Sequence, residues 1–224
     1  MGRIRCECRS FIMDTEPWWN LDETVQYFMS KKADPLIVDR LKLVENREQK
    51  AALDLGCGGG RHTELLVALG FTVWACDVNE SMVEATRARV PAIADRITQS
   101  SMLSLQYPAD NFDVVVSTGV FHQAMSMREY ETVLCEVGRV MRSNGILAMN
   151  IFVRSHLDTT LELISEREHV YKTHEGLHMT LLTPHEFIEH AERAQLELES
   201  AVEPQVRIEP TGTRVVWKAF LRKP

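Results

Sequence analysis

The chain has 224 residues, of which 45% are hydrophobic, and a net charge of −7 from 25 basic and 32 acidic side chains. This composition is typical of an ordered globular domain, and it excludes a disordered chain and a disulfide-stabilised mini-protein. The acidic balance argues against general affinity for nucleic acid, and no apolar run reaches the roughly 18–20 residues that cross a bilayer.

The start of the chain predicts a tail followed by two helices. Residues 1–16 are predicted to be a tail, because Met1 to Ser10 are polar and no apolar signal-peptide core follows them. The five cysteines have no framework spacing, so we expect a cytoplasmic protein. Helical patterning begins at Asp22, and Asp34-Pro35 predicts a second helix, with Asp34 as its N-cap. We therefore expect residues 1–49 to form a tail and lid helices before a main domain over 50–224.

From residue 51 to 152, strand and helix patterns alternate. Strands are predicted over 51–55, 71–76, 97–101, 112–117 and 145–152, and helices over 61–69, 81–90 and 128–141. This alternation is typical of a doubly wound parallel sheet with helices on both faces.

The last third of the chain has a different pattern. Residues 153–181 show no strand signal. His174 and His178 have the i, i+4 spacing of one helix face, which could present both to a metal, but a polar lid is the favoured interpretation. We therefore predict no metal site. Thr183 opens a helix with a capping box. Strands over 196–202 and 214–221 are joined by a segment too short for a helical crossover, which predicts an antiparallel pair.

The most specific motif is the strand, glycine loop and helix over 51–69. Glycines in Gly56-Cys57-Gly58-Gly59-Gly60 allow a close backbone approach to a ligand, and Asp77 ends the next strand. In doubly wound sheets such an acid binds ribose hydroxyls. A ribose-bearing cofactor follows, but the nicotinamide fingerprint fails because Arg61 stands where its third glycine is required.

Four segments resemble the motifs of class I S-adenosylmethionine-dependent methyltransferases. They are Leu53-Asp54-Leu55-Gly56-Cys57-Gly58-Gly59-Gly60, Cys76-Asp77-Val78-Asn79-Glu80-Ser81-Met82, Phe112-Asp113-Val114-Val115-Val116-Ser117 and the Arg142-Ser143-Asn144-Gly145 turn. The resemblance covers residues 50–152 and implies a Rossmann-like sheet of seven strands, mostly parallel, with an antiparallel C-terminal strand pair. It also implies S-adenosylmethionine as the cofactor.

The resemblance implies a role for each cofactor-site position. Gly56, Cys57 and Gly58 line the methionine part through backbone atoms, with support from Asp54, and Asp77 holds the ribose. The remaining implied contacts are Val78, Met82, Ser101 and Met102 at the adenine, and the Thr118 carbonyl at the methionine amine. Arg61 pairs with the methionine carboxylate or is a solvated arginine at a helix start; both interpretations stay open.

The acceptor side is less specific. His122 follows the 112–117 strand and is a candidate general base, or else a helix-capping or packing residue. Tyr27, among the aromatic residues Trp18, Trp19, Tyr27 and Phe28, is a candidate pocket residue. Residues 153–182 occupy the place of an acceptor-binding insertion in the family.

These observations favour methyl transfer to an oxygen or nitrogen of a small molecule, by a monomer or homodimer without nucleic-acid or membrane partners. The alternatives are a cofactor-binding protein with non-methylating catalysis, such as cyclisation, a regulatory role, or a nicotinamide oxidoreductase.

Overall fold

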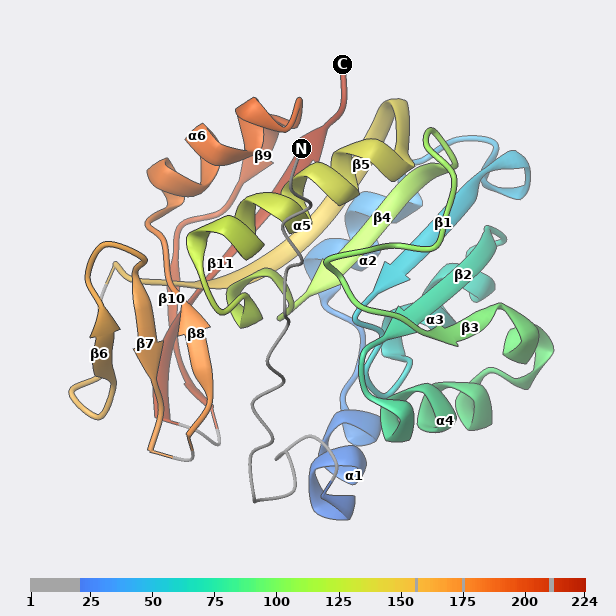
Figure 1. Ribbon diagram of the computed structural model, residues 1–224. Helices are drawn as coiled ribbons and strands as arrows, with labels where there is room; N and C mark the ends of the chain where they lie inside the picture. The colour runs from blue at the N-terminus through green and yellow to red at the C-terminus, as the bar shows by residue number, and fades with distance from the viewer. Residues whose placement is uncertain (1–20, 156, 175, 210–211) are drawn as a thin grey trace, which may run out of the picture.

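The computed structural model describes residues 21–155, 157–174, 176–209 and 212–224, so the predicted tail and the tryptophans at 18 and 19 lie outside the described residues. The main sheet has the order β10-β11-β5-β4-β1-β2-β3, with β9 also paired to β11 (Figure 1). Its strands are β1 (Ala51–Leu55), β2 (Thr72–Asp77), β3 (Ile97–Gln99), β4 (Phe112–Thr118), β5 (Met141–Val153), β9 (Glu197–Ala201), β10 (Gln205–Glu209) and β11 (Gly212–Arg222).

The prediction of a seven-stranded, mostly parallel sheet is confirmed. Strands β1 to β5 run parallel, and β11 is antiparallel to β5. Strands β9 and β10 pair with successive parts of the same β11 edge, at residues 219–222 and 212–216. They therefore share the seventh strand position. The sequence pattern predicted β9 and its antiparallel pairing, but it missed β10, a short edge strand between two prolines.

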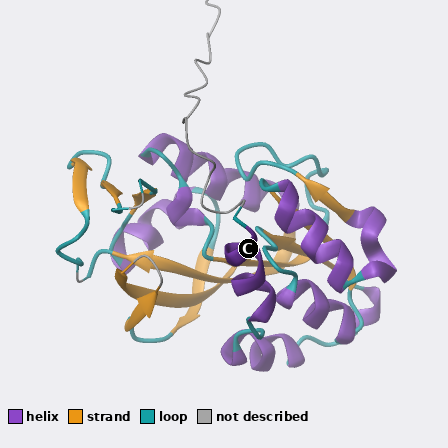
Figure 2. Cartoon of the chain, turned by 90° about the horizontal axis from the view of Figure 1, so that it is seen from below, coloured by secondary structure: helices purple, strands orange, loops and turns teal. Residues whose placement is uncertain are grey.

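Helices cover both faces of this sheet, as the view from below also shows (Figure 2). The helices are α1 (Asp22–Ser30), α2 (Pro35–Lys42), α3 (Arg61–Ala68), α4 (Glu80–Arg89), α5 (Met127–Val140) and α6 (Pro184–Arg193), with 3₁₀ segments η2 (Arg47–Gln49), η3 (Pro91–Arg96) and η4 (Phe121–Gln123). Helices α5 and α6 pack on one face, and α2, α3 and α4 pack on the other. In the residues that the structure describes, no helix combines the length and apolar character that a membrane crossing requires.

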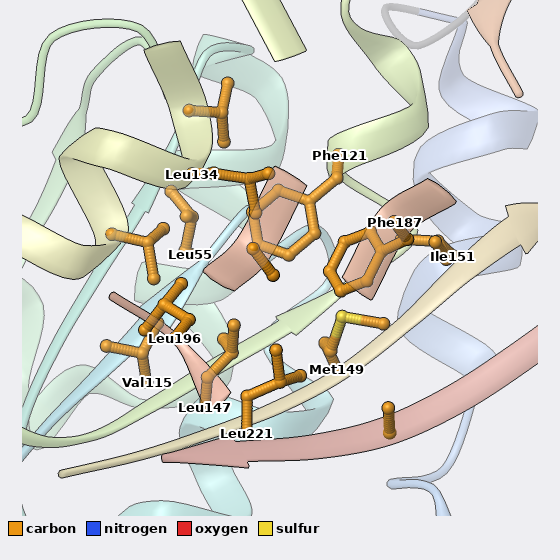
Figure 3. Close-up of a cluster of buried hydrophobic side chains, with 14 of the residues drawn as sticks. Leu55, Val115, Phe121, Leu134, Leu147, Met149, Ile151, Phe187, Leu196 and Leu221 are labelled. Atoms are coloured by element: carbon orange, nitrogen blue, oxygen red, sulfur yellow. The ribbon is translucent and has the colours of Figure 1, made fainter. Parts of the chain in front are cut away.

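The larger core lies between the sheet and helices α5 and α6 (Figure 3). Helix α5 presents a stripe of buried residues at Tyr130, Val133, Leu134 and Val137, which is the spacing of one helix face. Phe121, at the start of η4, and Phe187 of α6 are fully buried in the same cluster. This packing fixes the position of η4, the segment that follows the carboxyl end of β4.

A second, three-stranded antiparallel sheet corrects the prediction that residues 153–181 lack strands. It consists of β6 (Glu162–Ser165), β7 (Val170–Lys172) and β8 (His178–Thr180). Its strands are only three or four residues long, too short for a period-2 pattern to be distinguished. His178 lies in β8 and His174 in the preceding turn, so their spacing is not that of a helix face.

Candidate active site

The glycine loop between β1 and α3 lies where the strand order reverses, because β1 has β2 on one side and β4 on the other. This is the place where doubly wound folds bind ligands. Gly56 has a φ of +70°, and a Cβ atom there would lie 2.2 Å from Cγ2 of Val120. Both the conformation and the contact require glycine at this position.

Helix α1 lies directly on the glycine loop. A Cβ atom on Gly59 would lie 2.6 Å from the backbone nitrogen of Met29, near the end of α1. Arg89 of α4 donates from Nη1 to the carbonyl oxygens of both Met29 and Gly59, at 3.1 Å each. Helix α1 and the glycine loop are therefore held together by a shared arginine.

Asp77 stands at the carboxyl end of β2 and faces the glycine loop. Its Oδ2 atom accepts a hydrogen bond from the backbone N–H of Gly58 at 2.9 Å, and Oδ1 accepts one from Asn79 at 3.0 Å. Burial raises the pKa of Asp77, while these backbone N–H groups oppose that shift. The half-buried carboxylate thus joins the ends of β1 and β2 at the predicted ribose site.

Asp54 is buried beneath the loop. Thr63 donates its hydroxyl to Oδ2 of Asp54 at 2.6 Å, but burial prevails and raises the pKa of this carboxyl to about 6. Cys57 is also buried, and its Sγ atom accepts from the Thr86 hydroxyl at 3.4 Å. Both side chains support the loop from inside the protein.

The predicted adenine-site residues lie just after β2, on α4 and in the segment after β3. Val78 is 65% exposed, Met82 is buried, Ser101 is exposed and Met102 is half-buried against the larger core. Asn79 caps α4 by accepting from the backbone N–H of Ser81. The structure therefore leaves Val78 and Ser101 accessible to a ligand at the ends of β2 and β3.

Arg61 and Thr118 meet across the loop. Nη2 of Arg61 donates to Oγ1 of Thr118 at 3.3 Å, and burial lowers the pKa of the guanidinium. Among the described residues no carboxylate lies within 4.0 Å of this arginine. Arg61 is thus a half-buried cation beside the end of β4 and not a solvated residue at a helix start.

His122 lies in η4, is 1% exposed and stacks on the ring of Phe152 at a centroid distance of 4.2 Å. Its Nδ1 atom accepts a hydrogen bond from the backbone N–H of Phe152 at 3.2 Å, so Nε2 carries the proton in the neutral ring. Burial lowers the pKa of His122 to about 3. The other ring nitrogen, Nε2, lies 3.2 Å from the side-chain amide of Gln123, so both ring nitrogens have partners within the protein.

Tyr27 of α1 reaches the other side of the site. Its hydroxyl lies 3.4 Å from Oε2 of Glu209 in β10, and Lys31 lies over its ring at 4.0 Å. Helix α1 is therefore linked to the sheet edge as well as to the glycine loop. Tyr27 lies in α1 and His122 in η4, so the two candidate residues come from different elements.

The β6–β8 sheet docks beside His122. The hydroxyl of Thr180 in β8 donates to the carbonyl oxygen of Ala124 at 2.7 Å, and Glu168 accepts from the backbone N–H of Met127 at 2.9 Å. These bonds connect residues of the 153–182 segment to the segment that follows β4. In the described parts of the chain, no group of three or more metal-ligating side chains is present.

One residue of the site, His62, could not be identified from a sequence motif. His62 is buried and bonds both to the α1–α2 connection and to Thr118. A single histidine in a helix gives no pattern, and its partners are 28 and 56 residues away along the chain.

A family model described as "Methyltransferase domain" matches residues 53–149. Residues 53–149 form a class I S-adenosylmethionine-dependent methyltransferase domain. The match includes the glycine loop, Asp77 and the end of β4, which are the parts that the sequence motifs predicted. S-adenosylmethionine is the cofactor of this family.

Among curated relatives, this methyltransferase domain is similar to the ubiquinone biosynthesis O-methyltransferase of Rickettsia felis, with 27% identity over 166 residues. That match covers 70% of this chain and 65% of the relative. The chain thus spans less than two thirds of the length of the relatives that it matches first.

Solved structures share the fold of the methyltransferase. A methyltransferase from Methanosarcina mazei has a TM-score of 0.69 at 19% identity, covering 86% of this chain and 99% of that one. The 1,6-didemethyltoxoflavin-N1-methyltransferase of Burkholderia thailandensis, with S-adenosylhomocysteine bound, has a TM-score of 0.59 at 20% identity, covering 78% and 71%. The [4+2]-cyclase SpnF also has a TM-score of 0.59, at 16% identity, covering 84% and 80%.

Proposed function

We propose that this methyltransferase domain transfers a methyl group from S-adenosylmethionine to an oxygen or nitrogen of a small-molecule acceptor. The observation that carries the proposal is the position of Asp77. Its carboxylate lies beside the glycine loop at the reversal of strand order, where it can accept hydrogen bonds from a ribose.

The residues around Asp77 fit the cofactor. Gly56, Cys57 and Gly58 offer backbone atoms to the methionine part, with Asp54 beneath them, while Arg61 receives the methionine carboxylate. The Thr118 carbonyl accepts from the methionine amine. The adenine then lies against Val78 and Met82, with its edge toward Ser101 and Met102.

The bound cofactor supplies an activated methyl group, so the protein contributes alignment and exclusion of water. We assign these tasks to α1 above the glycine loop and to the β6–β8 sheet beside η4. Residues 153–182 then select the acceptor, since they dock on the segment after β4.

His122 and Tyr27 have different tasks in this proposal. His122 cannot take a proton while Nδ1 accepts from Phe152, so it shapes the acceptor wall by stacking. Tyr27 closes the opposite side through α1. An acceptor that ionises readily, such as an acidic phenol, needs no further base.

Two of the similar proteins support the proposal. The Rickettsia felis relative is an O-methyltransferase, and the Burkholderia thailandensis protein with the same fold is an N-methyltransferase. The cyclase with the same fold keeps open the alternative of non-methylating catalysis on the bound cofactor. Oligomeric state, cytoplasmic location and independence from nucleic acid remain predictions from the sequence.

The first test is calorimetric titration of the purified protein with S-adenosylmethionine, S-adenosylhomocysteine and, as control, NAD. We expect both sulfur compounds to bind and NAD not to bind, and Asp77→Ala to weaken both about 10- to 100-fold through loss of a charge-assisted hydrogen bond. Binding of NAD alone would refute the cofactor assignment.

The second test is an acceptor screen with phenols, amines and heterocyclic nitrogen compounds. Methyl transfer requires one S-adenosylhomocysteine for each product molecule. Product without S-adenosylhomocysteine would instead establish the non-methylating alternative.

A further inference from the structure

His62 has a defined tautomer because of its position between two segments. The side chain is 2% exposed, and its Nε2 atom lies 3.2 Å from the backbone nitrogen of Asp34. A backbone N–H can only donate, so Nε2 is the acceptor and the proton of the neutral ring is on Nδ1. Burial, with Arg61 as a secondary cause, lowers the pKa of His62 to about 3, so the ring is neutral at physiological pH.

This tautomer determines what Thr118 can do. Nδ1 of His62 lies 3.4 Å from Oγ1 of Thr118, and Nη2 of Arg61 lies 3.3 Å from the same oxygen. Both are donors, so they use the two lone pairs of the hydroxyl oxygen. The hydroxyl hydrogen of Thr118 must therefore be donated, and no acceptor for it is found in the described part of the chain.

Two unsatisfied features thus lie together at the carboxyl end of β4. Thr118 has a hydrogen to donate. Arg61 feels Asp54 and Asp34 only from a longer range, and it forms no ion pair within 4.0 Å among residues 21–155, 157–174, 176–209 and 212–224. A carboxylate satisfies both, because one of its oxygens can accept from the guanidinium and the other from the hydroxyl.

We propose that His62 is a positioning residue: by donating from Nδ1 it makes the Thr118 hydroxyl a hydrogen-bond donor, and this donor and Arg61 together receive the carboxylate of the methionine part of the cofactor. The proposal rests on the proposed function above. It also links cofactor binding to the α1–α2 connection, because Asp34 holds His62 from the opposite side of the ring.

The test compares two ligands that differ only in this carboxylate: S-adenosylmethionine and decarboxylated S-adenosylmethionine. Thr118→Val keeps the shape of the side chain and removes the hydroxyl, and Thr118→Ser restores it. We expect Thr118→Val to weaken S-adenosylmethionine about 10- to 100-fold and to leave the decarboxylated ligand within 3-fold, and Thr118→Ser to recover most of the affinity.

Two amide variants test His62 itself. The Asn side chain places an N–H group near the position of Nδ1, whereas the Gln side chain places one near Nε2. We therefore expect His62→Asn to retain the preference for the carboxylate-bearing ligand and His62→Gln to lose about 10-fold of it. Thermal unfolding of each variant verifies that it is folded.

The outcomes separate this proposal from the proposed function. If the wild-type protein binds neither ligand, both are refuted. If it binds both ligands, and Thr118→Val or His62→Gln weakens them equally or not at all, only the positioning role is refuted.

Discussion

The buried carboxyl of Asp54 makes the stability of the protein depend on pH in a calculable way. Its pKa rises from 3.8 to about 6 on folding, a difference of roughly two pKa units, and each unit corresponds to about 1.36 kcal/mol. The folded state holds the proton more tightly than the unfolded state does. The free energy of unfolding therefore falls by about 3 kcal/mol as the pH rises from about 4 to above 6, and then stays level.

The assay is urea unfolding of the wild-type protein and Asp54→Asn, followed by circular dichroism. Asn cannot titrate, so the difference between the two free energies of unfolding isolates this one group. Between pH 5 and pH 7.5, we expect the free energy of unfolding of the wild-type protein to fall, relative to that of Asp54→Asn, by about half of the 3 kcal/mol. A difference that stays constant over this range would refute the reasoning.

Thr63→Val provides a matched second variant. Its hydroxyl donates to Asp54 and stabilises the charged form, opposing the effect of burial. Removing it should raise the pKa of Asp54 further and move the pH-dependent window upward. A window that moves to lower pH would contradict the described hydrogen bond.

Three other predictions concern α1, the sheet edge and α6. Gly59→Ala places a Cβ atom against Met29, so we expect a loss of about 1–3 kcal/mol and faster hydrogen exchange confined to α1 and the glycine loop; unchanged exchange in α1 would refute the contact. Lys218→Met leaves the nearly buried carboxylate of Asp34 without the ammonium that lies 2.6 Å away, so the free energy of unfolding measured with denaturant should fall by about 3 kcal/mol. Arg222→Met breaks the more exposed pair with Glu199 and should lower the same quantity by less than about 1 kcal/mol. Thr183→Ala removes the capping box of α6 and should cost about 1 kcal/mol by the same assay; equal losses for the two cationic positions, or none for the cap, would contradict these assignments.

The sequence was sufficient for the doubly wound part of the fold. Strands β1 and β4 are short apolar runs that are buried on both faces, and such runs between helical patterns leave few alternatives. Strand β10 could not be predicted in this way, because Val206 and Ile208 are exposed and neighbouring prolines suggest a loop. Pairing with β11, a tertiary contact, decides its structure.

The candidate site likewise has a part that local sequence patterns predict and a part that depends on tertiary packing. Asp77 and the glycine loop lie at the ends of successive strands, so local patterns place them together. The contact between Gly59 and Met29, and the bonds of His62, join segments that only packing brings together. The hypothesis that His122 is a general base rests on its position after β4, and chain order carries no information about which of its ring nitrogens is hydrogen-bonded.

The β6–β8 sheet has a small core of its own, with Tyr171, Met179 and Leu181 packed against Phe152 and Leu161. Since this core is separate from the two clusters that hold the main sheet, mutations within it can accumulate without altering the glycine loop. On the proposal that residues 153–182 select the acceptor, a lineage can acquire a new acceptor by changing this small sheet while its cofactor site is inherited unchanged. Divergence among relatives is expected to concentrate in this segment.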